Sequence, residues 1–172
     1  RQAQRKAAVP NDIEPRTIAI IGGHGGMGRC FDRLFTMLGH RVLLVDHDTE
    51  LTGPEAAAQA DVIIIAVNIE STVDVIEAIG PACRPEALLM DLTSIKQEPV
   101  EAMLAASNCT VIGTHPLFGP SLHSLQGQRM VLTPARTVGD TDWQIWLTDM
   151  LSAVGLTLLD STPEAHDRAM AV

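Results

Sequence analysis

The fold of this chain is decided by residues 18–28, which read IAIIGGHGGMG. The first four residues are an apolar run typical of a strand, and an amphipathic helical pattern follows the glycines. Together they form the G-x-G-x-x-G pattern of a strand, a tight turn and a helix. In that pattern Gly23 makes the turn, Gly25 lets backbone N–H groups approach a pyrophosphate, and Gly28 lets the helix pack closely on the strand. The stretch predicts a dinucleotide site, with the pyrophosphate at the positive end of the helix dipole.

An acidic residue at the end of the next apolar run supports this prediction. Asp46 follows residues 42–45 (VLLV) and lies about 20 residues after the glycines, where the pattern requires an acid. A carboxylate there accepts hydrogen bonds from the adenosine ribose and repels a 2′-phosphate. Residues 47–50 (HDTE) contain no Arg or Lys to pair with such a phosphate. The sequence therefore favours NAD over NADP, and a solvated acid after a strand is the alternative interpretation of Asp46.

Size and composition indicate one domain with a substantial core, because the chain has 172 residues, of which 46% are hydrophobic. A formal charge of −9 argues against nucleic acid or an anionic membrane as a partner, since phosphates are held by clustered Lys and Arg. Cys30, Cys83 and Cys109 lack C-x-x-C spacing and no histidine pair has metal-ligand spacing, so we expect no metal. With no apolar stretch long enough to span a membrane, these features favour a reducing cytoplasm.

Strand-type and helix-type patterns alternate along the chain. Residues 1–16 are polar and contain two prolines, so we interpret them as a linker or disordered leader before a domain at 17–161. We expect an α/β fold with a Rossmann-type doubly wound parallel sheet, which binds its ligand at the carboxyl ends of the strands. The patterns predict helices from 27, 71, 98 and 140, and strands at 18–21, 41–46, 61–67, 87–91, 110–114, 129–133 and 156–159.

The last residues predict that the chain continues into another helical part. Ser161 and Glu164 have the spacing of a capping box, with Pro163 at an early helical position. Residues 162–172 therefore begin a helix, and they contain no stop signal. We expect a further helical segment after Val172.

Two polar clusters follow the fourth and fifth predicted strands, where side chains of a doubly wound sheet face a bound nicotinamide. They are residues 91–96 (DLTSIK) and 115–120 (HPLFGP). His115 stands at a strand end in a loop stiffened by two prolines, which suits a general base or hydrogen-bond acceptor. We expect it to share a crevice with the glycine turn. The alternatives are a structural role for His115, a helix cap at Ser94 and a solvated charge at Lys96.

Residues 115–120 resemble the H-P-M-F-G-P segment of prephenate dehydrogenases, enzymes of tyrosine biosynthesis, and residues 91–96 resemble their D-x-x-S-x-K segment. The glycine loop at 22–28 is similar to that of the T-protein-like branch, which is fused to a chorismate mutase. Residues 164–167 (EAHD) look like the family's E-H-D run at the start of its linking helix. The resemblance covers about residues 17–172, and its H-P-x-F-G-P motif is more specific than a glycine loop.

The resemblance implies an NAD-dependent oxidative decarboxylation of prephenate to 4-hydroxyphenylpyruvate, a step that needs no metal. It implies that His115 accepts the proton of the ring hydroxyl, that Ser94 orients His115 and contacts the nicotinamide or this hydroxyl, and that Lys96 supports the network. The predicted cofactor site consists of Gly23, His24, Gly25, Gly26, Met27, Gly28, Asp46, Val67 and Ser94.

Two features depart from the family pattern. Asn68 stands where the family commonly has Pro, so we expect a looser loop beside the nicotinamide. Binding a dianionic substrate calls for Arg or Lys, and the predicted site offers little beyond Lys96. The family supplies these arginines from a C-terminal helical dimerisation domain. The resemblance therefore implies a homodimer for the intact protein and an inactive fragment, and it leaves open a chorismate mutase domain before Arg1.

Three other functions remain as alternatives. An arogenate dehydrogenase shares every motif named above. A non-catalytic regulatory module that binds NAD needs the glycine loop and Asp46 but has no use for His115. A different β-hydroxyacid dehydrogenase of similar fold is the third. The assembly state and inhibition by tyrosine are left open.

Overall fold

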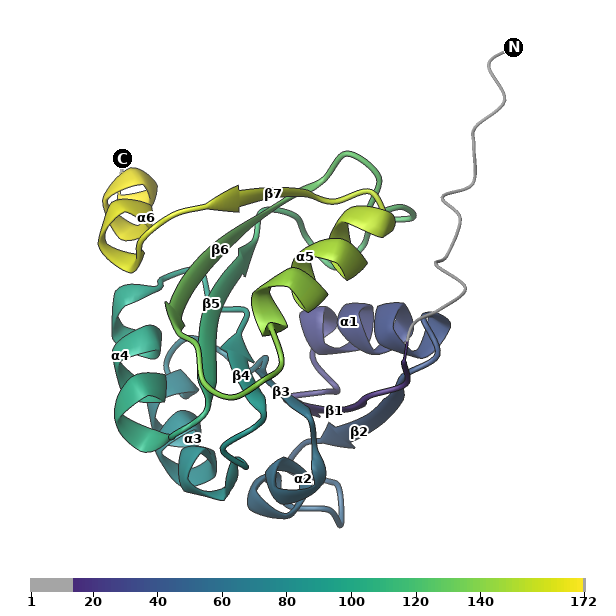
Figure 1. Cartoon of the computed structure of the whole chain (residues 1–172). Helices are drawn as coiled ribbons and strands as arrows, with labels where there is room; N and C mark the ends of the chain where they lie inside the picture. The colour runs from purple at the N-terminus through teal and green to yellow at the C-terminus, as the bar shows by residue number, and fades with distance from the viewer. Residues whose placement is uncertain (1–13, 172) are drawn as a thin grey trace.

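The computed structural model describes residues 14–171, which form a seven-stranded sheet with helices on both faces (Figure 1). The strand order is β2-β1-β3-β4-β5-β6-β7. The strands are β1 (Thr17–Ile21), β2 (Arg41–Val45), β3 (Val62–Ile65), β4 (Leu88–Asp91), β5 (Thr110–Pro116), β6 (Arg129–Arg136) and β7 (Thr157–Asp160). The helices are α1 (Gly26–Met37), α2 (Gly53–Gln59), α3 (Thr72–Ile79), α4 (Gln97–Ala106), α5 (Trp143–Ala153) and α6 (Pro163–Met170), with a 3₁₀ turn at Gly80–Ala82. The predicted doubly wound α/β fold is confirmed, and its winding reverses between β1 and β3.

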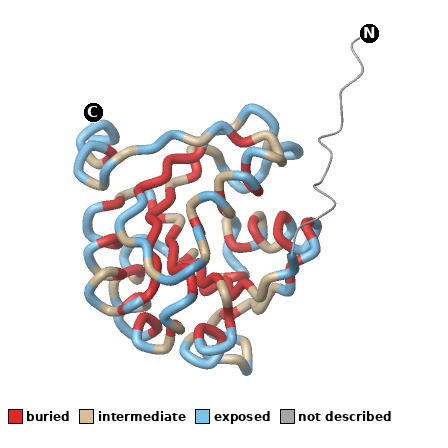
Figure 2. Tube along the Cα trace, viewed as in Figure 1, coloured by how far each residue is buried: buried red, intermediate tan, exposed pale blue. Residues whose placement is uncertain are grey.

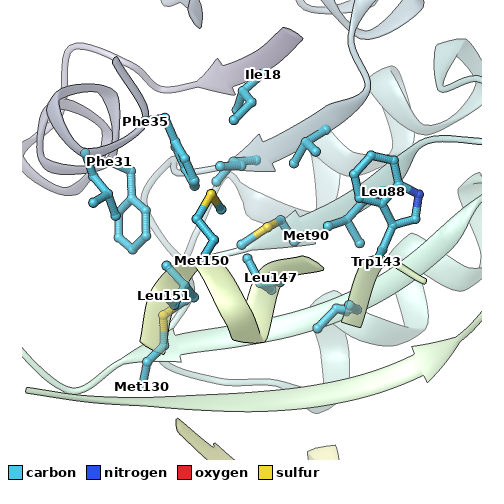
Figure 3. Close-up of a cluster of buried hydrophobic side chains, with 14 of the residues drawn as sticks. Ile18, Phe31, Phe35, Leu88, Met90, Met130, Trp143, Leu147, Met150 and Leu151 are labelled. Atoms are coloured by element: carbon cyan, nitrogen blue, oxygen red, sulfur yellow. The ribbon is translucent and has the colours of Figure 1, made fainter. Parts of the chain in front are cut away.

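The central strands are apolar along their whole length because both faces of the sheet are covered. Successive residues of a strand point to opposite faces, so Ile20 packs with α1 and α5, whereas Ile21 packs with α2, α3 and α4. Figure 2 shows the buried residues concentrated along these strands. The side chains on each face of the sheet form one hydrophobic cluster. Figure 3 shows the cluster on the face covered by α1 and α5, to which Phe35 of α1 and Trp143 of α5 contribute. Because helices cover both faces of the sheet, a ligand can reach the central strands only at their ends.

The last part of the sheet differs from the predicted parallel arrangement. β6 runs antiparallel to β5, and β7 runs parallel to β6. A parallel partner for β5 would need a crossover, usually a helix, but residues 117–128 contain none. β5 also extends to Pro116, past its predicted end at residue 114. His115 therefore lies within the strand, opposite Val131 of β6, and its backbone is held by the sheet.

Three helix starts differ from the prediction, and α5 begins at Trp143 rather than at residue 140. The sequence pattern did not indicate α2, which begins with a capping box: Thr52 Oγ1 accepts from Glu55 N, and Glu55 Oε2 accepts from Thr52 N at 2.9 Å. α6 begins after Thr162, whose hydroxyl accepts from Ala165 N at 3.2 Å. The predicted capping box between residues 161 and 164 is therefore wrong: the N-cap is Thr162, and Ala165 at the third helical position has no polar side chain to complete a box.

Most of the predicted leader, residues 1–13, lies outside the described residues. Its last residue, Arg16, belongs to the fold, because its N–H donates to His40 Nδ1 at 3.0 Å and its guanidinium lies 5.1 Å from the ring centre of Trp143. No helix within residues 14–171 has the length and apolar character needed to cross a membrane.

Candidate active site

The carboxyl ends of β1, β2 and β3 surround a cleft of about 680 Å³. It lies where the winding of the sheet reverses, which is the place where doubly wound sheets bind ligands. Among the predicted cofactor residues, His24, Gly25, Asp46 and Val67 line the cleft. The whole lining consists of Gly22, His24, Gly25, Arg29, Asp46, His47, Asp48, Ala66, Val67, Asn68, Ser71 and Val75.

The glycine turn has the predicted shape with a shift of one residue. Gly22, not Gly23, has the positive φ of the tight turn (88°), and its N–H donates to Val45 O at 2.8 Å. Gly23 instead allows close packing, since a Cβ on it would lie 2.7 Å from Cδ2 of Leu44. A Cβ on Gly28 would overlap the carbonyl oxygen of Gly22. α1 can therefore approach the turn only because residue 28 is glycine, as predicted.

The first turn of α1, which adjoins the cleft at Gly25 and Arg29, has free backbone donors. The first hydrogen bond of the helix joins Arg29 N to Gly25 O at 2.9 Å. The N–H groups of Gly26, Met27 and Gly28 therefore have no partner within the helix. Free N–H groups of this kind, together with the helix dipole, suit an anion. These three predicted residues are not among the lining residues of the cleft, so their contact with the cofactor stays a prediction.

Asp46 is held at the end of β2 with its carboxylate toward the glycine turn. Its Oδ2 accepts from His24 N at 3.1 Å, and its Oδ1 accepts from His47 N at 2.9 Å. Burial raises the pKa of Asp46, but these two hydrogen bonds and the neighbouring imidazoles outweigh burial and bring the pKa below its ordinary value. The carboxylate is ionised and keeps lone pairs for further donors such as ribose hydroxyls.

Arg29 is a cleft residue that the sequence reasoning missed. Its Nε donates to His24 O at 2.9 Å, which holds the guanidinium against the glycine turn. The imidazole of His24 lies on the other side, with Nδ1 2.9 Å from Asp48 Oδ1. The available indication was its place directly after Gly28, in the first turn of the helix. Arg29 supplies a positive charge beside the anion-binding N–H groups in a chain that is acidic overall.

His115 lies at the carboxyl edge in a chain of three hydrogen-bonded side chains. Its Nδ1 is 2.9 Å from Nε2 of His166 in α6, with the two rings 82° apart. His166 is only 3% exposed, and its Nδ1 is 2.7 Å from Asp167 Oδ1. In the sequence, residues 164–167 are marked only by their resemblance to the family. His166 and Asp167 were not predicted as site residues, because a separation of 51 positions hides the contact between His166 and His115.

The surroundings of His115 keep its imidazole neutral. Burial is the main cause that lowers the pKa of His115 to about 4; a positive charge on His166, when that ring is protonated, and the charge of Lys96 act in the same direction, and Asp167 acts in the opposite direction. At neutral pH the ring therefore carries a lone pair and can accept a proton.

Lys96 is a buried ion pair rather than a solvated charge. Its side chain is 0% exposed, and its ammonium contacts the equally buried carboxylate of Asp91. Burial lowers the pKa of Lys96, and the neighbouring carboxylates oppose this shift. Asp91 also accepts from Thr93 N at 3.2 Å and from Thr114 N at 3.3 Å. The pair lies in the interior, so the ammonium is not presented to a substrate carboxylate.

Two loop residues at this edge were also singled out by the sequence. Ser94 is exposed, and the partner of His115 Nδ1 is His166 instead. The contact of Ser94 with a nicotinamide or a substrate hydroxyl stays a prediction. Asn68 does not leave a gap in its loop, since its Oδ1 accepts from Ser71 N at 3.0 Å just before α3.

The strand register brings His115 and the glycine turn to one edge. Through the pairing of the intervening strands, Gly113 of β5 is level with Ile21 of β1. His115 stands two residues beyond that level, as the glycine turn does. The loop after β5 then returns to the turn, because a Cβ on Gly26 would lie 2.9 Å from Pro120 Cγ. His115 is not among the lining residues of the cleft of about 680 Å³, so the shared crevice stays a prediction.

Comparison with known proteins gives related sequences of one family. The family model described as prephenate dehydrogenase, nucleotide-binding domain, matches residues 32–159. A probable arogenate/prephenate dehydrogenase of Methanocaldococcus jannaschii is 37% identical, over 91% of this chain and 39% of its own length. The T-protein of Enterobacter agglomerans is 35% identical, over 92% of this chain and 41% of its own length. The chain thus spans about two fifths of the length of these curated relatives.

Solved structures share the fold. Prephenate dehydrogenase from Aquifex aeolicus, in complex with hydroxyphenyl propionate and NAD+, has a TM-score of 0.74 at 17% identity, over 94% of this chain and 65% of that chain. Arogenate dehydrogenase from Synechocystis has a TM-score of 0.73 at 22% identity, over 90% of this chain and 63% of that chain. Since the family model covers most of the sequence, the chain belongs to the prephenate dehydrogenase family, of which it carries the nucleotide-binding domain.

Proposed function

We propose that the chain binds NAD and supplies the proton acceptor for the oxidative decarboxylation of prephenate to 4-hydroxyphenylpyruvate. The observation that carries this proposal is a neutral, half-buried His115 at the sheet edge that also holds the glycine turn. A module that only carries a nucleotide needs no imidazole at this place. The Methanocaldococcus relative, whose name is probable arogenate/prephenate dehydrogenase, supports it.

The cleft suits NAD in shape and charge. The free N–H groups at the start of α1 would donate to the pyrophosphate, next to Gly25 and Arg29 of the cleft lining. Asp46 is an ionised acceptor at the position expected for the ribose diol, and its charge disfavours a 2′-phosphate. The glycine at 28 keeps the turn and helix close enough for this approach.

The residues around His115 suit the proton transfer that the reaction requires. NAD held at the glycine turn and Asp46 would supply the hydride acceptor for the ring carbon that bears the hydroxyl. As positive charge develops there, His115 accepts or shares the hydroxyl proton. The bond to the ring carboxylate then breaks, its electron pair completes the aromatic ring, and CO₂ leaves. The proton returns to the phenol oxygen, so His115 is regenerated.

The substrate carboxylates must find their cations elsewhere. Lys96, the one cation that the sequence offered, is buried and paired with Asp91. The proposal is that arginines of a helical domain outside these 172 residues bind the substrate, and that this domain also forms a homodimer. The chain alone should bind NAD without measurable turnover. Turnover of prephenate by the 172-residue chain would contradict this part of the proposal.

Replacing His115 by Asn tests the central step in a form of the protein that turns over substrate. Asn keeps a polar side chain but cannot accept a proton at neutral pH, so turnover should be lost while the Kd for NAD stays the same. Persistent turnover would reject His115 as the proton acceptor. Both steady-state kinetics and a fluorescence titration with NAD are needed to separate the two effects.

Arogenate is the second candidate substrate, since the name of the Methanocaldococcus relative covers both compounds. Comparing kcat/KM for prephenate and arogenate decides between them. We also propose a cytoplasmic location, because Cys30, Cys83 and Cys109 are all free thiols, as in a reducing compartment.

A further inference from the structure

The side chains behind His115 form a device that selects one form of its imidazole. We infer that His166 and Asp167 are positioning residues, which fix the tautomer of His115 so that its Nε2 carries the lone pair. This inference rests on the proposed function, in which His115 accepts a proton. It adds two residues on α6 that act through His115 rather than on the substrate itself.

The chain of hydrogen bonds begins at a carboxylate that can only accept. Asp167 Oδ1 accepts a hydrogen bond from Lys96 N at 2.7 Å, and Asp167 Oδ2 accepts one from Gln97 N at 2.9 Å. Burial raises the pKa of Asp167, but these bonds and that of His166 outweigh burial and lower it. The contact of 2.7 Å between Asp167 Oδ1 and His166 Nδ1 therefore has the histidine as donor.

The direction of the next hydrogen bond follows from the first. We infer the directions for the form in which both imidazoles are neutral, so that each ring has one donor and one acceptor nitrogen. With Nδ1 of His166 donating to Asp167, its Nε2 must accept, and His115 Nδ1, 2.9 Å away, must donate. The opposite tautomer of His115 would bring two lone pairs together at this distance. Nε2 of His115 is thus left unprotonated, which is the form that a proton acceptor needs.

The same carboxylate also anchors the helix that carries the device. Asp167 accepts hydrogen bonds from the two N–H groups at the start of α4, so it joins α6 to the loop that follows β4. The other charged groups near His115 are Lys96 and Asp91, which are paired with each other in the interior. They do not compete for His115 Nδ1. Docking of α6 and orientation of the imidazole therefore depend on one side chain.

Nitrogen-15 NMR of histidine-labelled chain at pH 8 measures the tautomers directly, without substrate. We expect His115 in the Nδ1–H form. The variant His166→Phe fills similar space without an acceptor and should move His115 toward the Nε2–H form. Asp167→Asn keeps an acceptor oxygen for His166 and should preserve the tautomer, whereas Asp167→Ala should not. Glu164→Gln, an exposed acid-to-amide change on the same helix, is the matched control and should leave the tautomer of His115 in place.

Kinetics in a form that turns over substrate give the functional readout. His166→Phe and Asp167→Ala should lower kcat by about 100-fold or more, the usual contribution of a general base, with the Kd for NAD unchanged. Asp167→Asn should retain most of kcat. This rescue by the amide separates positioning from a merely structural role, since both variants lose the charge.

Three results would be decisive. An Nε2–H tautomer of His115 in the unaltered chain overturns the inference, even if His115→Asn abolishes turnover and the proposed function stands. Equal kcat losses in Asp167→Asn and Asp167→Ala, with His115 in its original tautomer in both, also overturn it. The expected tautomers together with full turnover in His115→Asn would instead reject the proposed function and leave the tautomer assignment in place.

Discussion

Replacing Lys96 by Met probes the buried ion pair beneath the candidate site. Both side chains of the pair are 0% exposed, so Met, which retains most of the alkyl stem, leaves the Asp91 carboxylate buried without its cation. Removing one partner of a buried pair costs about 3–5 kcal/mol. The N–H groups of Thr93 and Thr114 still bond Asp91, so we expect the lower end of this range.

Urea unfolding followed by tryptophan fluorescence measures this loss, since Trp143 lies in the core. A loss of about 3 kcal/mol corresponds to roughly 6–12 °C in Tm for a domain of this size. The double variant Asp91→Leu/Lys96→Met removes both charges and should recover most of the stability. A loss below about 1 kcal/mol, the size found for exposed pairs, would refute the reasoning. Unchanged stability with abolished turnover would restore the catalytic role that the family resemblance implied for Lys96.

Three further predictions concern the cleft and His115. Asp46→Ala should weaken NAD by about tenfold and strengthen NADP, because a charged acceptor is lost; an unchanged preference in fluorescence titrations would argue against its ribose role. Gly28→Ala should destabilise the domain by about 1–3 kcal/mol and impair NAD binding, since its Cβ overlaps Gly22 O. Gly39→Ala has room for a Cβ but a φ of 91°, so it should lower stability while leaving NAD affinity intact. The pKa of His115 is about 4 in the folded chain against 6.5 in the unfolded one, so the unfolded chain binds more protons between these values. Its contribution to stability is complete above pH 6.5 and is lost as the pH falls toward 4, and His115→Asn should remove this part of the pH dependence of the urea midpoint.

Most of the fold could be predicted because local sequence patterns indicate its strands and helices. The strand at residues 62–65 is a continuous apolar run, and α1 repeats its apolar residues at helical spacing. α2 was not predicted because its seven residues are mostly alanine, proline and glycine, and only the capping pair Thr52 and Glu55 indicates a helix there. The direction of β6 escaped because an apolar run carries no sign of its direction. It is decided by the absence of a helix in the preceding loop of the described chain.

The candidate site divides in the same way. The part predicted to bind the dinucleotide lies within one short stretch of sequence, from the glycine turn to Asp46, where the spacing of the residues alone indicates a dinucleotide site. The proton-accepting part of the candidate site depends on contacts between distant residues, such as His115 with His166 and Lys96 with Asp91. Lys96 looks like a loop charge in the sequence, and only the packing of α4 and β4 shows that it is enclosed. Long-range contacts of this kind leave no periodic pattern to read.

The contact between Pro120 and Gly26 couples the residue types that evolution can place in the glycine turn and in the loop after β5. Because the proline ring occupies the space that a side chain at position 26 would need, the two positions cannot vary independently. A homologue that acquires a larger residue at 26 must lose the proline at 120 or displace the loop that carries it. The glycine turn and the segment after β5 should therefore change together among descendants of this domain.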